Sequence, residues 1–354
     1  MTDAFGELRS LLQGRPDAQT LGRLCVSMRG WEPRERDEIL LPYAQSAVDR
    51  WPDELRAVGP DWAKRLLGGQ ERWAHATRFA RTLTVSFERP TRPEWDALAW
   101  CDWRALRQFV AMEVDGLDAG IDALSEVGVL ERLHELHVST RAGVPSVTSA
   151  MARGELSGIR ALMLEVGELG EDDLLQVATS EWRRLDALAL NGGPIVYGNA
   201  DRYCEPDVLA EEDFAQRLTR LHLSGACHGH RTLEMLARAP WTSRLEELEV
   251  NGWPTRDEDI ELHAMAMSEF AREANLSALR VLRFRISPRA EELRELSSNR
   301  TLRSLERIEV LWRGRLINRL PRLGRQVLDE DLFTESVRAQ WRDEEEKMAR
   351  REGS

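Results

Sequence analysis

The chain has 354 residues, of which 42% are hydrophobic and 31% charged, and these proportions exclude a wholly disordered protein. Its 49 basic and 61 acidic residues give a formal net charge of −12 at pH 7, which argues against nucleic-acid binding and against binding to a membrane surface. The first residues show no basic, apolar leader, no run of about eighteen apolar residues occurs, and the four cysteines form no dense disulfide framework. We therefore expect a cytoplasmic protein that neither crosses nor binds a membrane.

Residues 1–80 carry no repeat and are predicted to form an all-α N-terminal cap. Apolar residues at helical spacing predict two short amphipathic helices over residues 5–12 and 21–28, and a third over residues 39–48. Pro60 stands before Asp61, an order that is typical of a helix start. A helical block of this kind would cover the open end of the repeats that follow.

One phrase, L-x-x-L-x-x-L-x-(L/V/F), recurs from residue 130 onward. Each copy ends in two apolar residues separated by one position, and weaker copies come earlier, at Leu83 with Val85 and at Met112 with Val114. The copies follow one another at a near-constant interval, which indicates an internal repeat. The first residues of the nine pairs are Leu83, Met112, Leu136, Leu162, Leu188, Leu221, Leu248, Leu282 and Ile308.

The alternating pair in each copy predicts a short strand with both apolar side chains on one side. Leu188 and Leu221 should therefore be buried, whereas Ala189 and His222 should face the other way. Helical spacing occupies the stretches between the strands. Because one strand and one helix cannot bury their apolar faces alone, we predict an α/β solenoid over residues 81–325, with about nine strand–helix repeats. Its parallel sheet should form the concave side and its helices the convex side.

The phrase and its period resemble the leucine-rich repeats, in their ribonuclease-inhibitor-like class, over roughly residues 83–310. The asparagine that this family places three residues after the strand pair is absent here, since Arg141, Gly167 and Gly193 occupy the first such positions of the strong copies. The helical block before the repeats resembles the companion domain of bacterial leucine-rich-repeat proteins of myxobacterial and planctomycete type. That resemblance rests on Trp51-Pro52-Asp53-Glu54-Leu55, Trp62 and Leu66-Leu67-Gly68-Gly69.

After the repeats, residues 326–354 are predicted to form a C-terminal capping helix and a charged tail. A sparse apolar stripe at Leu328, Leu332, Val337 and Trp341 lies in a strongly charged stretch that ends in an acidic run.

No catalytic signature occurs: the sequence lacks G-x-x-x-x-G-K-(S/T), G-x-G-x-x-G, H-E-x-x-H and G-x-S-x-G. We therefore predict no catalytic residues, no cofactor and no small-molecule substrate. The alternative is a metal-dependent or Cys/His enzyme, because stacking of neighbouring repeats would bring two thiols and two imidazoles together, a set that suits tetrahedral Zn²⁺. Its centre would be formed by Cys204, Cys227, His228 and His230.

The favoured hypothesis is a non-enzymatic protein–protein interaction module, such as an adaptor, a scaffold or a regulatory or inhibitory subunit, that binds its partner on the concave face. The late repeats turn basic, and residues 312–325, placed beyond the last strand, hold five arginines and no acidic residue. Arginine grips carboxylates and phosphates bidentately, so an acidic or phosphorylated protein partner is expected. Replacing Arg283 and Arg285 by glutamate should weaken binding with little change in melting temperature. The predicted contact patch consists of Arg283, Arg285, Arg307, Trp312 and Arg313, with His222 and Trp253 beside it.

Overall fold

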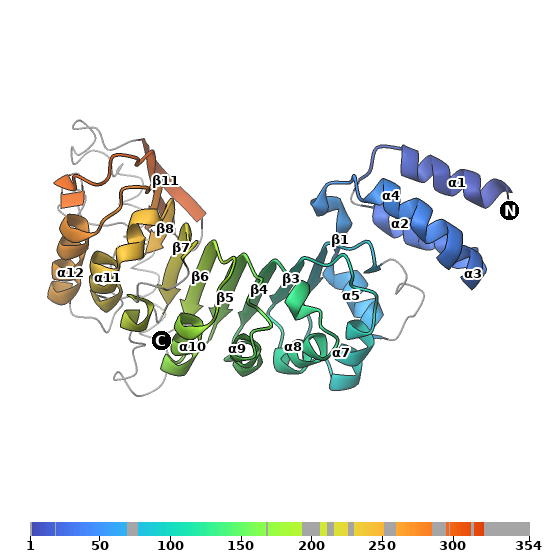
Figure 1. Cartoon of the computed structure of the whole chain (residues 1–354), viewed down its shortest axis with the longest axis horizontal. Helices are drawn as coiled ribbons and strands as arrows, with labels where there is room; N and C mark the ends of the chain where they lie inside the picture. The colour runs from blue at the N-terminus through green and yellow to red at the C-terminus, as the bar shows by residue number, and fades with distance from the viewer. Residues whose placement is uncertain are drawn as a thin grey trace, which may run out of the picture. The chain divides into compact units, whose positions relative to one another are not determined.

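The computed structural model describes residues 2–17, 19–68, 77–167, 169–192, 206–210, 216–225, 230–250, 260–284, 295–296, 298–312 and 315–321. The chain divides into two compact units, Met1–Tyr197 and Gly198–Ser354 (Figure 1). None of the helices in these ranges has the length and apolar character that crossing a lipid bilayer demands. The predicted C-terminal helix over residues 326–354 lies outside the described residues.

A small helical core opens the first unit, and its helices bury the apolar stripes seen in the sequence. Leu8, Leu24 and Val48 are each 1% exposed or less. Ile39 is an exception at 54% exposure, because a π-helical turn over Arg36–Leu40 rotates the chain so that Leu40 faces the core instead. The helices are α1 (Thr2–Gln13), α2 (Thr20–Ser27), α3 (Pro33–Glu35) and α4 (Leu41–Val48).

Parallel strands in chain order form the rest of the first unit. Each strand is paired in register with the next one, so that apolar residues of successive strands, such as Leu136, Leu162 and Leu188, lie side by side and are each 1% exposed. The strands are β1 (Ala57–Val58), β2 (Thr82–Val85), β3 (Gln108–Met112), β4 (Glu135–Thr140), β5 (Ala161–Val166) and β6 (Ala187–Gly192).

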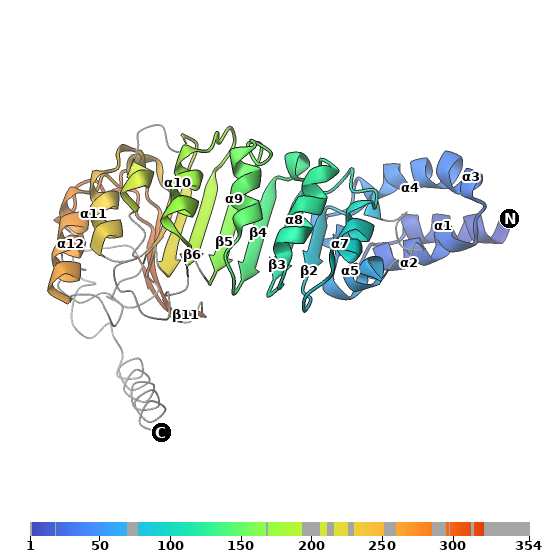
Figure 2. The same cartoon turned by 90° about the horizontal axis from the view of Figure 1, so that it is seen from below.

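Helices connect these strands and lie along one face of the sheet, as Figures 1 and 2 show for α7 to α10. Their apolar residues meet the buried side of the strands: Ile121 and Leu124 of α8, for example, are fully buried. We call the opposite side of β2–β6 the open face. The helices are α5 (Pro60–Leu67), α7 (Arg92–Ala99), α8 (Leu117–Glu126), α9 (Pro145–Ala152) and α10 (Glu171–Thr179).

The second unit repeats the strand–helix alternation. Leu221, Leu248, Leu282 and Ile308 lie side by side in its parallel strands, and each is 1% exposed or less. These strands are β7 (Arg220–Gly225), β8 (Glu247–Val250), β9 (Val281–Phe284) and β10 (Arg307–Trp312). The helices α11 (His230–Arg238) and α12 (Ile260–Glu273) precede β8 and β9.

Three expectations are corrected by the strands. The early pair is Phe109 with Ala111, both fully buried, and not Met112 with Val114; Met112 is 41% exposed at the end of β3. The all-α description of residues 1–80 is wrong at β1, which pairs with β2. Residues 312–325 were expected beyond the last strand, but Arg315–Pro321 forms β11, which pairs antiparallel with β10.

The corrected pair makes the repeat more regular. Leu83 lies beside Phe109, and Phe109 beside Leu136, so the two steps along the chain are almost equal. With Met112 as the anchor, a long step would be followed by a short one. The physical reason is the alternation of a strand: Phe109 and Ala111 face the helices, whereas Met112 is one position out of phase and faces the open side.

Candidate functional site

The predicted contact patch is only partly described by the structure. Arg283 lies in β9, Arg307 begins β10, and His222 lies in β7. Trp312 is the last residue of β10, and only its backbone is described. Trp253, Arg285 and Arg313 lie outside the described residues.

Within the described part of this patch, four polar residues form a row across the second unit. His222, Glu249, Arg283 and Glu309 occupy matching positions of β7, β8, β9 and β10. Because these positions are in register, their side chains share one face of the strands. We call these four residues the charged row.

The charged row is held together by Arg283. Its Nη1 donates to Glu247 Oε2 at 2.8 Å, and its Nε donates to Glu309 Oε2 at 2.7 Å. The same Nη1 lies 3.5 Å from Nε2 of His222, and Nδ1 of His222 lies 3.8 Å from Glu249 Oε2. Each member of the row therefore touches a neighbour of opposite or complementary polarity.

Burial makes these contacts structurally important. Glu249 and Glu309 are each 5% exposed, and the Arg283 side chain is 18% exposed. Burial by itself would lower the pKa of Arg283, but the hydrogen bonds to Glu309 and Glu247 outweigh it, so the pKa lies above its ordinary value. Nε of Arg307 also lies 2.9 Å from Glu309 Oε1. Arg283 and Arg307 are thus engaged by carboxylates of their own unit, with which an acidic partner would have to compete.

The Cys/His alternative stays a prediction. Cys204, Cys227 and His228 lie outside the described residues, whereas His230 is the half-buried first residue of α11. Across the ranges that the structure describes, no group of three or more His, Cys, Asp or Glu side chains is placed to hold a metal ion.

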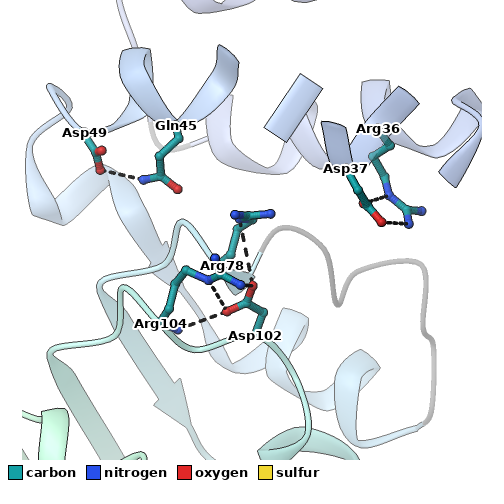
Figure 3. Close-up of polar contacts among 7 residues, drawn as sticks. All are labelled: Arg36, Asp37, Gln45, Asp49, Arg78, Asp102 and Arg104. Carbon is teal, nitrogen blue, oxygen red and sulfur yellow. Dashed lines mark hydrogen bonds and ion pairs between the residues drawn. The ribbon is translucent and has the colours of Figure 1, made fainter. Parts of the chain in front are cut away.

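Asp102 forms ion pairs with two arginines, Arg78 and Arg104. Asp102 lies 2.7 Å from Nη2 of Arg104 and 4.0 Å from Nε of Arg78, opposite the helical block that carries Asp37 (Figure 3). Burial is the main cause that lowers the pKa of Arg78, and Arg104 adds to it, while Asp102 and Asp37 oppose the shift. The neighbouring thiol of Cys101 has its pKa raised to about 12 by burial and by Asp102, so it is a poor nucleophile at neutral pH.

A cavity of about 740 Å³ lies in the helical block. Among the described residues that line it, none is Asp, Glu, His or Cys, so this part of its wall offers no carboxylate, imidazole or thiol for acid–base or nucleophilic chemistry. Two aromatic side chains, Tyr43 and Trp51, and two arginines, Arg15 and Arg50, contribute to the wall.

The open face of the first unit has the character of a contact surface. Exposure alternates along β4, β5 and β6, with each buried residue followed by one that is half-exposed. The half-exposed positions near the middle are small or apolar: Val110, Ala161, Met163, Ala187 and Ala189.

Polar side chains adjoin and divide these apolar positions. Gln108 Nε2 donates to Glu135 Oε2 at 2.9 Å, and Gln108 Oε1 accepts from Thr82 Oγ1 at the same distance. His137 lies in register between Val110 and Met163, and its Nε2 lies 3.8 Å from Glu165 Oε2. Apolar positions flanked by polar side chains are the usual anatomy of a protein–protein interface. Because the sequence pattern set the phase of this strand by Met112 and Val114, Gln108 and Val110 of β3 were not predicted to lie on this face.

Similarity to known proteins is found among solved structures and not among sequences. No protein-family model matches the sequence, and no curated protein sequence matches it. The chain is similar to a crystal structure of a protein from Bacteroides fragilis, determined by the Northeast Structural Genomics Consortium, with 12% sequence identity and a TM-score of 0.49. That similarity covers 72% of this chain and 70% of the other.

Proposed function

We propose that this protein is a non-enzymatic protein–protein interaction module whose partner binds the open face of the first unit. The observation that carries the proposal is a parallel sheet with helices on one face only. Parallel sheets are ordinarily covered on both faces, yet none of the described helices of the first unit lies over the other face of β3–β6 (Figures 1 and 2). Strand–helix repeat arrays use such surfaces for binding.

The chemistry of the open face supports a protein partner. Ala161, Met163, Ala187 and Ala189 leave a shallow apolar area against which a partner's side chains can pack. The polar side chains of Gln108 and Glu135 would hold the partner in register through hydrogen bonds, which give interfaces their specificity more than their affinity.

The same proposal includes the type of repeat and the role of the protein in the cell. The nearly equal steps between the buried anchors of β2 to β5, together with the L-x-x-L-x-x-L phrase, support a leucine-rich repeat of ribonuclease-inhibitor-like type in a bacterial protein. An adaptor, scaffold or regulatory subunit in the cytoplasm is the role that fits a chain without a catalytic signature. We propose that Arg283 and Arg307 stabilise the second unit, and that the partner contacts the open face of the first unit.

Affinity capture with matched variants tests the proposal. Met163→Arg with Ala189→Arg places two long charged side chains in the apolar middle of the open face, whereas Ser149→Arg places one on the exposed side of α9. The wild type and Ser149→Arg should capture the same partner from an extract, and the double variant should lose it while keeping its circular dichroism spectrum. Retention of the same partner by the folded double variant would exclude the open face as the binding surface.

A further inference from the structure

A row of basic residues lies along the edge where the strands of the first unit begin. Arg81, Arg107, His134 and Arg160 each stand directly before a strand, β2 to β5 in turn. Backbone hydrogen bonds of 2.7 to 2.9 Å connect each of these residues to the next one along the row. The amide of Arg107 donates to the carbonyl of Arg81, the amide of His134 donates to the carbonyl of Arg107, and the amide of Arg160 donates to the carbonyl of His134. The four positions are therefore equivalent in successive repeats and lie about 4.8 Å apart, the spacing of neighbouring strands.

The centre of this row is not neutralised. Nη1 of Arg107 donates to the carbonyl of Leu106 at 2.7 Å, and no carboxylate in the described part of the chain forms an ion pair with Arg107. Its pKa is lowered by burial first and then by the positive charges of Arg81 and Arg132, while the negative charge of Asp53 raises it. Two arginines and one carboxylate therefore act on Arg107.

His134 experiences the same positive surroundings. Burial lowers its pKa most, and Arg107, Arg160, Arg184 and Arg81 each lower it further. Repulsion among like charges weakens a fold unless a counter-charge relieves it. In an acidic protein, arginines gathered around a histidine in this way are better explained by an anionic ligand than by the stability of the chain. We call Arg81, Arg107, Arg132, His134, Arg160 and Arg184 the basic edge.

Carboxylates limit the length of the basic edge. Asp53 lies 3.6 Å from Nε of Arg81 at one end, and Asp186 lies 3.0 Å from Nη2 of Arg160 at the other. Three strand intervals separate Arg81 from Arg160, about 14 Å. An extended peptide rises about 3.3 Å per residue, so four or five residues span this distance. A single phosphate would use only one part of such a line, and a long nucleic-acid strand would meet the flanking carboxylates and a chain of net charge −12.

We propose that the basic edge binds a short, carboxylate-rich segment of a partner protein in extended conformation. Arg107 and Arg184 would grip carboxylates through their guanidinium groups, and His134 would gain a proton on binding. The basic edge is a surface separate from the open face, so its test does not depend on where the main partner binds.

Fluorescence anisotropy with a fluorescein-labelled octaglutamate peptide tests this proposal directly. The wild type should bind the peptide at low ionic strength, about 0.01 M, and bind it markedly less at about 0.15 M, because salt screens exposed charges. Arg107→Glu with Arg184→Glu should weaken binding at least tenfold at low ionic strength. Neither arginine forms an ion pair with a carboxylate in the described ranges, so the change removes charge from the site and breaks only the hydrogen bond from Arg107 to the carbonyl of Leu106 among the contacts described above.

A control variant of equal charge separates the site from general electrostatics. Arg9→Glu with Arg141→Glu changes the net charge by the same amount at two exposed positions, one on α1 and one after the far end of β4. This control should bind within about twofold of the wild type. If the glutamate pair at the basic edge unfolds the chain, Arg107→Gln with Arg184→Gln replaces it, with the same direction of effect expected.

Three results would overturn the proposal: no binding of octaglutamate by the wild type, equal weakening in the basic-edge and control variants, or tighter binding of a labelled single-stranded oligonucleotide than of octaglutamate at the same edge. The last result would assign the basic edge to nucleic acid in place of an acidic peptide.

Discussion

Arg283 on β9 donates from Nε to Glu309 on β10 at 2.7 Å, and Glu309 is only 5% exposed. The two residues occupy the same position of successive repeats, so the strand register brings them together. This ion pair changes what a charge reversal at Arg283 would do. A glutamate there would face Glu247 and Glu309, so loss of stability is expected together with any loss of binding, and the melting temperature would not stay unchanged.

Removing the Arg283 guanidinium should destabilise the second unit. Arg283→Met leaves the buried Glu309 and the nearby Glu247 without this partner, and breaking a buried pair from one side costs about 3–5 kcal/mol. Arg280→Met is the matched control, because Arg280 pairs with Glu306 at 2.7 Å on the same two repeats but with about half of each side chain exposed. That change should cost less than about 1 kcal/mol. Urea unfolding of both variants measures the difference, and equal losses would contradict the structural role of Arg283.

The corrected strand phase predicts opposite sensitivities for two neighbours on β3. Phe109 is fully buried beside Leu83 and Leu136, so Phe109→Ala should lower the free energy of unfolding by about 3–5 kcal/mol. Met112 is 41% exposed on the open side, and Met112→Ala should change it by no more than about 0.5 kcal/mol. Chemical denaturation of the two variants tests the strand phase. A larger loss of unfolding free energy in Met112→Ala than in Phe109→Ala would support the pair Met112 and Val114 that the sequence predicts.

Gly120 is required by a close approach between α7 and α8. A Cβ added there would stand 2.7 Å from the ring of Trp95, which is fully buried and has no room to move away. Gly120→Ala should therefore destabilise the chain by about 1–3 kcal/mol. Gly6→Ala offers the control, since nothing lies within 4 Å of the added Cβ on the exposed side of α1, and the better helix propensity of alanine should stabilise by up to about 1 kcal/mol. Thermal melting of the pair should show shifts of opposite sign.

Cys101 should resist alkylation in the folded protein. Burial, with a contribution from Asp102, raises the pKa of its thiol from 9.0 to about 12, so the reactive thiolate is about a thousandfold scarcer at pH 8 than in the unfolded chain. Mass-spectrometric mapping after iodoacetamide treatment should find the Cys101 peptide unmodified in the native protein and modified in guanidinium chloride. Because the unfolded chain loses this proton at lower pH than the folded one, stability should also fall as the pH rises from about 9 to 12. Rapid labelling of native Cys101 would show the thiol to be more ionised than this.

The strand phase was predictable wherever two leucine-type residues end the repeated phrase. Leu188 and Leu221 were predicted to be buried, and both are, at 1% and 0% exposure. The phase failed at Met112 because M-x-V and F-x-A are both apolar pairs at strand spacing; only the more even steps to the neighbouring anchors favour Phe109. The strand β11 lacks the phrase, so its assignment depends on its antiparallel pairing with β10.

The charged row and the basic edge differ in how far the sequence alone could predict them. Arg283 and Arg307 were assigned to a docking patch because this region of the sequence is rich in arginine. In the structure both arginines pair with Glu309, which the strand register places beside Arg283. The basic edge was also present in the sequence, as basic residues at 81, 107, 134 and 160 in steps of one repeat. Which of these residues pair with carboxylates depends on side-chain positions, which the sequence does not provide.

Hydroxyl-radical footprinting of the protein, alone and with its captured partner, tests the open face most directly. Met163 on β5 and Met112 at the end of β3 lie on that face, whereas Met265 on α12 is 67% exposed and belongs to the second unit. Oxidation of Met112 and Met163 should fall several-fold in the complex while that of Met265 stays unchanged. Unaltered oxidation of Met112 and Met163 in a saturated complex would contradict binding at the open face.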